Sequence, residues 1–120
     1  MSALAPTAGE GRSDIRVRRD DFDLSTEVAA LRSADPGVGA ICAFVGTVRD
    51  RNEGECVLAL ELEHYPGMTE KAIGAMVAEA RQRFGARAIT VIHRIGPLAL
   101  QDQIVLVAVG AAHRGDAFRA

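Results

Sequence analysis

The chain has 120 residues, of which 48% are hydrophobic and 25% charged, and its formal net charge is -2 at pH 7. This length suits one domain with a single core, which needs no disulfide or metal to fold. The slightly acidic net charge argues against non-specific nucleic-acid binding, which uses a basic face. The few aromatic residues, four Phe, one Tyr and no Trp, argue against base stacking. Cys42 and Cys56 form no CxxC pair, there is no signal-peptide pattern, and no apolar run approaches the roughly 20 residues that span a bilayer. We therefore expect a reduced, cytoplasmic protein.

The N-terminal region divides into a tail and the start of the domain. Residues 1–13 are rich in Ala, Gly, Ser, Thr and Pro without periodicity, which predicts a mobile tail before a single domain over residues 14–120. Residues 15–18 alternate apolar and charged side chains. That alternation is typical of a short edge strand whose arginines deter unwanted pairing.

Three long apolar segments predict the main strands. Residues 38–48 and 103–110 are apolar on both parities, so each is expected to be a central strand buried on both faces. Residues 88–95 predict another long strand, which Gly96 and Pro97 are expected to turn. Cys42 lies inside the first of these runs and is expected to be a small core residue.

Two helices are expected between the strands. Residues 24–33 predict a short helix with Asp23 or Ser25 as N-cap. A longer helix is expected from a Thr69 cap through Phe84, with Gly85 as its C-terminal stop. Its predicted apolar stripe, which places the methionine in the core, consists of Ala72, Ile73, Met76, Val77, Ala80 and Phe84.

The segment between these helices contains a polar loop and an amphipathic strand. Residues 50–55 are polar, and residues 56–64 then alternate leucine with acidic side chains, which predicts a half-buried strand. Glu61 and Glu63 share one face of that strand. A solvated face is favoured over a pair of acid–base carboxylates, because nothing nearby would desolvate them.

The predicted order is strand, helix, strand, strand, helix, strand, strand and the start of a final helix. Short turns between strands, with two helices on one side, are typical of the α+β class with a mostly antiparallel or mixed sheet. The chain has no phosphate-binding glycine loop, dinucleotide fingerprint, nucleophile elbow or HExxH helix. A zinc site and a Ser–His–Asp triad are disfavoured, because the three histidines are scattered and no serine lies near a strand end.

Cationic side chains at the ends of apolar strands are the remaining candidates for chemistry: Arg49, Arg94, His113 and Arg114. Guanidinium groups bind phosphate and carboxylate through two parallel hydrogen bonds, so this pattern indicates an anion site. The alternative is that they are ordinary surface residues following strands. The residues themselves name no reaction.

Several motifs in register resemble the family of the molybdopterin synthase catalytic (large) subunit. They cover roughly residues 22–120 and read Phe44-Val-Gly-Thr-Val-Arg49-Asp50, Leu62-Glu-His-Tyr-Pro-Gly-Met-Thr-Glu-Lys-Ala72, Val91-Ile-His-Arg-Ile-Gly96 and Ala112-His113-Arg114 with Ala117-Phe118. The resemblance implies an α/β-hammerhead fold and a homodimer within a heterotetramer. It also implies a partner, a small ubiquitin-like sulfur carrier whose C-terminal Gly-Gly bears a thiocarboxylate.

The resemblance further implies a reaction and its site. Two sulfurs would pass from the carrier to cyclic pyranopterin monophosphate, giving the dithiolene of molybdopterin without a metal or separate cofactor. Matched residue by residue, the resemblance places Thr47, Val48 and Arg49 at a substrate-binding position of the family. It also matches His113 and Arg114 with the family's His-Arg pair at the same pocket. The arginines would orient the phosphate and stabilise the carboxylate left on the carrier, and the imidazole would bind phosphate or move protons.

One departure concerns lysine. The family is expected to use two lysines after the Ala-Phe motif, whereas Lys71 is the only lysine in this chain, which ends at Ala120. We therefore expect a form shortened at its C-terminus, with sulfur transfer impaired unless lysines are supplied in trans. Two alternatives stay open: a non-catalytic member that binds carrier or pterin, and a generic anion-binding module unrelated to molybdenum.

Overall fold

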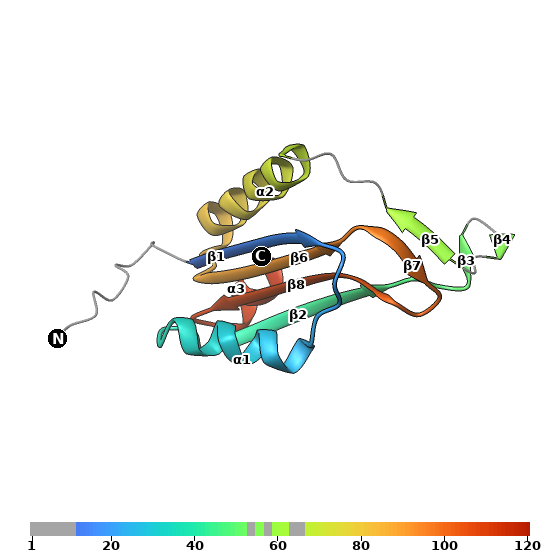
Figure 1. Ribbon diagram of the computed structural model, residues 1–120. Coiled ribbons are helices and arrows are strands. Elements are labelled where there is room, and N and C mark those ends of the chain that lie inside the picture. The colour runs from blue at the N-terminus through green and yellow to red at the C-terminus, as the bar shows by residue number, and fades with distance from the viewer. Residues whose placement is uncertain (1–11, 53–54, 57–58, 63–66) are drawn as a thin grey trace.

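A computed structural model describes residues 12–52, 55–56, 59–62 and 67–120 (Figure 1). Its elements follow in the order β1 (Arg12–Arg18), α1 (Leu24–Ala34), β2 (Ala40–Thr47), β3 (Arg51–Asn52), β4 (Glu55–Cys56), β5 (Ala59–Leu62), α2 (Met68–Phe84), β6 (Ala88–Arg94), β7 (Gly96–Ala99), β8 (Gln103–Ala111) and α3 (Arg114–Arg119). The predicted tail falls mostly on residues 1–11, outside the described residues. β1 already begins two residues before the predicted start of the domain.

The main sheet has four strands in the order β1-β6-β8-β2. β1 pairs in parallel with β6, whereas β6 and β2 both pair antiparallel with β8. Two small sheets, β3-β4 and β5-β7, extend from one end of the main sheet (Figure 1). The mixed α+β architecture predicted from the sequence is thus confirmed, as are the central place of β8 and the edge place of β1.

The prediction that residues 38–48 form a central strand is wrong, because β2 lies at the edge of the sheet and, within the described part of the chain, pairs only with β8. Ile41 and Val45 pack against the core on one face. On the other face Phe44 keeps 61% of its surface exposed. A run that is apolar on both parities thus marks a central strand only when tertiary structure supplies a neighbour on each edge.

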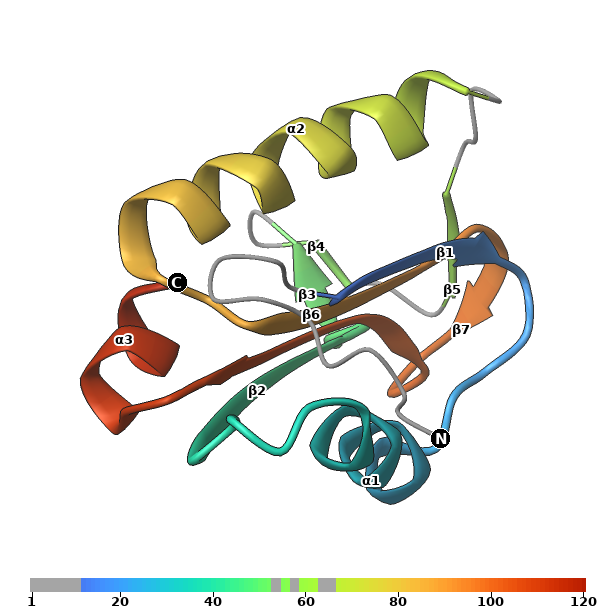
Figure 2. The same ribbon diagram turned by 90° about the vertical axis from the view of Figure 1, so that its left-hand side faces the viewer.

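The two long helices cover opposite faces of the sheet, not one side as predicted (Figure 2). Alternate residues of each strand point to opposite faces, so each helix builds its own core. The α1 core consists of Phe22, Leu31, Ala88, Ile92, Leu106 and Ala108. The α2 core consists of Ile73, Val77, Ala86, Ile89, Val91 and Val109, with Ala120 after α3 packed against it.

The helix ends agree with the predictions except at the start of α2. Asp23 caps α1, and its Oδ1 accepts a hydrogen bond from the Thr26 amide at 3.1 Å. α2 starts from Gly67, whose φ of 83° favours glycine, so Thr69 lies inside the helix and is not its cap. Gly85 ends α2 in the left-handed conformation, as predicted.

Three further local predictions need revision. Ala72 is exposed and Met76 is 62% exposed, so neither belongs to the buried stripe of α2. Gly96 does bend the chain, with φ of 82°, but it also begins β7 rather than a loop. The predicted strand 56–64 includes residues outside the described ranges. Within residues 56–64 the structure contains the end of β4 and all of β5. The prediction that Glu61 and Glu63 share a solvated face concerns side chains that the structure does not describe.

Candidate functional site

The segment Thr47–Arg49 lies where β2 leaves the main sheet, just after a register irregularity between Gly46 and Thr47. The Val48 side chain is 3% exposed. Its amide donates to the Asp102 carbonyl at 2.9 Å, and its carbonyl accepts from the Gln101 amide at 2.8 Å. Val48 therefore anchors the segment, while Thr47 and Arg49 are exposed beside it. Among the described residues, Arg49 has no ion-pair partner.

His113 and Arg114 lie at the opposite end of the β2–β8 pair. β8 ends at Ala111, and His113 is the N-cap of α3, its carbonyl accepting from the Ala117 amide at 3.2 Å. Both side chains are exposed, and neither has a hydrogen-bond or ion-pair partner within the described part of the chain. The His113 imidazole and the Arg114 guanidinium, from adjacent residues, are therefore both exposed to solvent.

The start of β2 packs closely against this His113 end. The Gly39 amide donates to the Ala111 carbonyl at 2.9 Å. A Cβ at Gly39 would lie 2.4 Å from the Ala112 carbonyl oxygen, a distance that real Cβ atoms do not show. Glycine is therefore required here, because any side chain would push the His113 segment away from β2.

A buried ion pair supports the loop that precedes β2. Asp35 is 2% exposed, and its carboxylate accepts from Arg87 Nε at 3.0 Å and Arg87 Nη2 at 3.1 Å. It also accepts from the Gly37 amide at 2.8 Å. The Arg87 guanidinium, and after it the Gly37 amide, hold the pKa of Asp35 below its usual range. The loop before β2 is thus tied to the loop before β6.

One chain does not bring the two groups of predicted site residues together. The register pairs Ala40 with Ala111 at one end of the β2–β8 ladder and Thr47 with Gln103 at the other. Seven residue steps of about 3.3 Å separate these ends by roughly 23 Å. The expectation of one shared pocket is therefore not met within a single chain, because antiparallel pairing carries the ends of β2 and β8 in opposite directions.

Arg94, the fourth predicted cation, is occupied by structural contacts. Its Nε donates to the Arg19 carbonyl at 3.1 Å and its Nη1 to the Gln103 carbonyl at 2.9 Å, and Asp21 lies 3.7 Å away. The Arg94 side chain is 11% exposed. It joins the ends of β1, β6 and β8 and is not free to bind a ligand.

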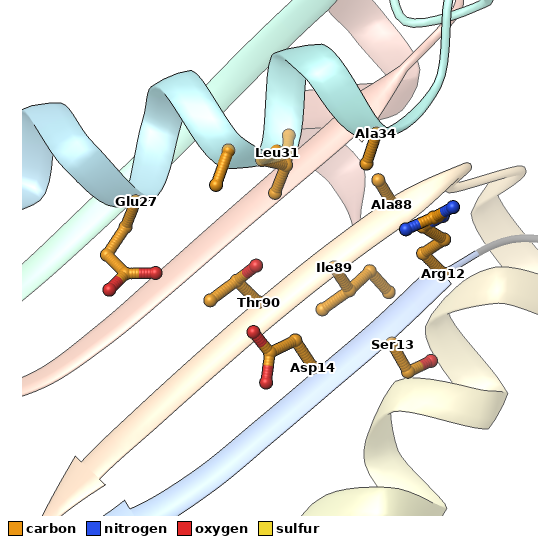
Figure 3. Close-up of a pocket in the computed structure, with 10 residues that line it drawn as sticks. Arg12, Ser13, Asp14, Glu27, Leu31, Ala34, Ala88, Ile89 and Thr90 are labelled. Carbon is orange, nitrogen blue, oxygen red and sulfur yellow. The ribbon is translucent and has the colours of Figure 1, made fainter.

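A cavity of about 530 Å³ lies between α1 and the β1–β6 edge, away from the predicted residues (Figure 3). Figure 3 shows the Glu27 and Asp14 carboxylates pointing into this space from helix and sheet. Both are paired with Arg16: Asp14 at 3.1 Å and Glu27 through two hydrogen bonds. Both carboxylates of this cavity are therefore already engaged by one guanidinium, which is typical of structural ion pairs.

A second, mostly apolar groove of about 260 Å³ lies under α2. It is lined by Ile73, Met76, Val77, Ala80, Ile89, Val91, His93, Val105, Val107, Val109 and Ala120. His93 Nδ1 is buried there without a hydrogen-bond partner. The sequence indicated this residue only as a strand position, because burial on that face depends on the placement of α2.

Two properties of the described residues bear on the kind of protein. No group of three or more His, Cys, Asp or Glu side chains is placed to hold a metal ion there. None of the described helices is long and apolar enough to cross a membrane. The fold and the exposed side chains define the class: a small α+β protein with exposed cationic groups at both ends of an antiparallel strand pair.

Comparison with known proteins identifies the family. The profile of the family described as "MoaE protein" matches residues 17–120. A "Molybdopterin synthase catalytic subunit" of Ralstonia nicotianae is 57% identical over 106 residues, which are 88% of this chain and 60% of that protein. The protein of the same name from Pseudomonas aeruginosa is 48% identical over 88% of this chain and 71% of its own length. The chain belongs to the MoaE family, as the sequence motifs indicated.

Solved structures agree with this assignment. "Molybdopterin cofactor biosynthesis protein E" of Burkholderia multivorans superposes with a TM-score of 0.81 at 56% identity, covering 90% of this chain and 70% of that one. "Molybdopterin Synthase" of Staphylococcus aureus gives 0.76 at 30% identity, covering 87% and 74%. The chain thus spans between 60% and about three quarters of the length of these relatives.

Proposed function

We propose that the chain acts as the catalytic subunit of molybdopterin synthase. It would transfer sulfur from a thiocarboxylated carrier protein to cyclic pyranopterin monophosphate and form the molybdopterin dithiolene. The observation that carries the proposal is the family membership over residues 17–120, together with exposed cations at the matched positions that have no partner among the described residues. We place the reaction in the cytoplasm, where thiols such as the free Cys42 remain reduced.

The chemistry assigns a role to each exposed cation. Arg49 and Arg114 would bind the substrate phosphate by charge-assisted hydrogen bonds. Each sulfur transfer replaces the carrier thiocarboxylate with a carboxylate, a second anion for these guanidinium groups to stabilise. His113 would hold phosphate or move protons as the pterin reacts. Val48 would position Arg49 and would not touch substrate through its buried side chain.

We further propose that two copies of the chain form each complete site. The ends of the β2–β8 ladder that lead to Arg49 and to the His113–Arg114 pair lie roughly 23 Å apart along one chain, farther than a single small pterin phosphate extends. Two copies related by a two-fold axis present both groups twice and complete two sites. A carrier protein on each copy then gives the heterotetramer expected from the sequence. A solved Helicobacter pylori complex of subunits 1 and 2 of "Molybdopterin-converting factor" shares the fold, with a TM-score of 0.70 at 18% identity.

The test of the reaction is an assay with thiocarboxylated carrier and cyclic pyranopterin monophosphate. The Ralstonia relative, assayed in parallel, is the positive control. We expect dithiolene product that requires both the carrier and the precursor. Carrier binding without product would favour a non-catalytic family member. No carrier complex at micromolar concentration would contradict the proposal.

Substitutions test the residue roles. We expect Arg49→Ala and Arg114→Ala each to weaken binding of the phosphate-bearing precursor by roughly tenfold, the loss of one charge-assisted contact. Both side chains are exposed, so thermal stability is expected to stay within about 1 °C, as for the exposed control Arg32→Ala. Isothermal titration and thermal unfolding measure the two effects. A fall of several degrees would show that the arginine is structural.

Mixing inactive variants tests the two-copy site. Arg49→Ala and His113→Ala chains are unfolded together in equal amounts and refolded, so that half of the dimers contain one of each. Each mixed dimer holds one intact site, so about one quarter of the wild-type binding sites should return. Arg49→Ala mixed with the double variant Arg49→Ala/His113→Ala is the control and should restore none. Equal results from the two mixtures would show that each chain holds its own site.

A further inference from the structure

The end of β8 leads to the exposed His113–Arg114 pair and is held by two neighbouring segments. The Gly39 amide donates to the Ala111 carbonyl at 2.9 Å, and the Arg87 amide donates to the Gly110 carbonyl at 2.8 Å. Gly110 and Ala111 are both buried, so water does not readily replace either hydrogen bond. Both carbonyls lie within three residues of the pair. The placement of these two donors therefore determines where β8 delivers the pair.

The buried Asp35–Arg87 ion pair links these two donor segments. The Arg87 guanidinium donates to the Asp35 carboxylate through Nε at 3.0 Å and Nη2 at 3.1 Å. The same carboxylate accepts from the Gly37 amide at 2.8 Å. A Cβ on Gly37 would lie 2.5 Å from the guanidinium, so the backbone of this loop lies directly against the Arg87 side chain. One carboxylate therefore fixes both the loop that contains Gly39 and the residue that holds Gly110.

Helix α3 anchors the His113–Arg114 pair from its other side. Ala117 is 3% exposed, and Ala120 packs against the α2 core. His113 connects β8 to α3 with an extended backbone. Among the described residues neither side chain of the pair has a hydrogen-bond or ion-pair partner that would fix its direction. The pair is thus an exposed joint between two anchored segments, and the directions of its imidazole and guanidinium depend on both anchors.

We propose that Asp35 is a positioning residue for the His113–Arg114 pair, acting through its contacts with Arg87 and with the loop before β2. This role rests on the proposed function, because it concerns the same anion site. Asp35 is 2% exposed and its carboxylate is occupied by Arg87 and Gly37, so it acts without touching substrate. Groups that bind a reacting anion need placement within about 0.5 Å. Without the ion pair, the imidazole and the guanidinium remain present but spread over several directions.

Amide exchange read by NMR tests whether Asp35 holds the end of β8, and it needs no substrate. Asp35→Asn keeps the shape of the side chain and removes its charge. We expect the ratio of the Gly39 to the Leu106 exchange rate to rise about tenfold or more in this variant. The reason is that the loop opens locally while the middle of β8 stays paired. Ile73→Ala destabilises the α2 core but leaves the ion pair intact, so this control should not raise the ratio. An unchanged ratio in Asp35→Asn would overturn the proposal.

Binding of the phosphate-bearing precursor separates a positioning role from a purely structural one. Isothermal titration is made where thermal unfolding shows every variant to be folded. We expect Asp35→Asn to bind roughly fivefold more weakly than wild type, and Ile73→Ala to bind as wild type does. Arg87→Lys keeps the charge but loses the two parallel hydrogen bonds to Asp35, so it should weaken binding likewise.

Wild-type affinity in folded Asp35→Asn would overturn the positioning role of Asp35. If Asp35→Asn does not fold, the same result in Arg87→Lys would overturn it. Neither measurement depends on turnover. A wild-type chain that binds the precursor but forms no product would therefore refute the proposed sulfur transfer and leave the positioning role standing.

Discussion

At the scale of single residues, the molecule separates cations that hold the fold from cations that face solvent. Arg87 and Arg94 are largely covered and bonded to Asp35 and to main-chain carbonyls. Arg49 and Arg114 have no such partners among the described residues. If a guanidinium that donates to a buried carboxylate turned away to bind a ligand, it would leave that carboxylate buried and unpaired. The cost would be several kcal/mol. Only the exposed arginines are therefore available for an anion.

The Asp35–Arg87 pair predicts a specific pH dependence of stability. Because the folded-state pKa of Asp35 is depressed, its contribution is complete above the unfolded-state pKa of about 4 and is lost as pH falls through the folded-state pKa. We expect Asp35→Asn to lower the free energy of unfolding by about 2 kcal/mol at pH 7. The loss should shrink as pH falls below about 4. Urea unfolding at pH 7 and pH 3 measures both changes.

Asp116→Asn is the matched control for this prediction. Asp116 pairs with Arg119 at 2.8 Å, but the two side chains are 38% and 63% exposed. Exposed pairs contribute little, so the control should change stability by less than about 0.5 kcal/mol at either pH. If both variants lost a similar free energy of unfolding at pH 7, burial of Asp35 would not explain the strength of the Asp35–Arg87 pair.

At the scale of elements, α2 contacts the sheet through a narrower stripe than its sequence suggests. Ile73 and Val77 are 8% and 6% exposed, while Met76 is 62% exposed and only borders the apolar groove. Helical periodicity gives the side of a helix that is apolar, but the residues that become buried depend on the angle at which the helix crosses the sheet. Ile73 and Val77 therefore hold the helix in place.

This difference predicts unequal effects of truncation along one helix. Ile73→Ala should lower the free energy of unfolding by about 3 kcal/mol, because it leaves a cavity between α2 and the sheet. Met76→Ala removes a side chain of similar size from an exposed position and should cost less than about 1 kcal/mol. Chemical denaturation of the two variants measures the difference. Equal losses would indicate that Met76 is covered in solution.

At the scale of the whole molecule, the two strands that carry the candidate site residues differ in how they are held in the sheet. The central strand β8 is paired on both edges, whereas within the described residues β2 is paired only with β8. Amides at a free edge exchange with solvent through small local openings. Hydrogen exchange therefore reports separately on the centre and on the edge of the sheet.

We expect amides of β6 and β8 to be the slowest to exchange at every protein concentration. The amides of β2 that point away from β8 should exchange at least tenfold faster than the amides of β8, because they lack a partner strand among the described residues. Hydrogen–deuterium exchange read by mass spectrometry makes the comparison. Equal protection along β2 and β8 would contradict the edge position of β2.

The sequence by itself determined the class of fold, the central place of β8, the start of α1 at Asp23 or Ser25, the stop at Gly85 and the family. These features depend on local chemistry: strand periodicity, a carboxylate beside a free amide, a glycine with positive φ, and motifs in register. Tertiary structure alone decided that β2 is an edge, that α1 and α2 cover opposite faces, and that Arg49 lies far from His113. Each of these depends on which segment becomes the neighbour of another, and a pattern along one strand cannot specify what lies beside it.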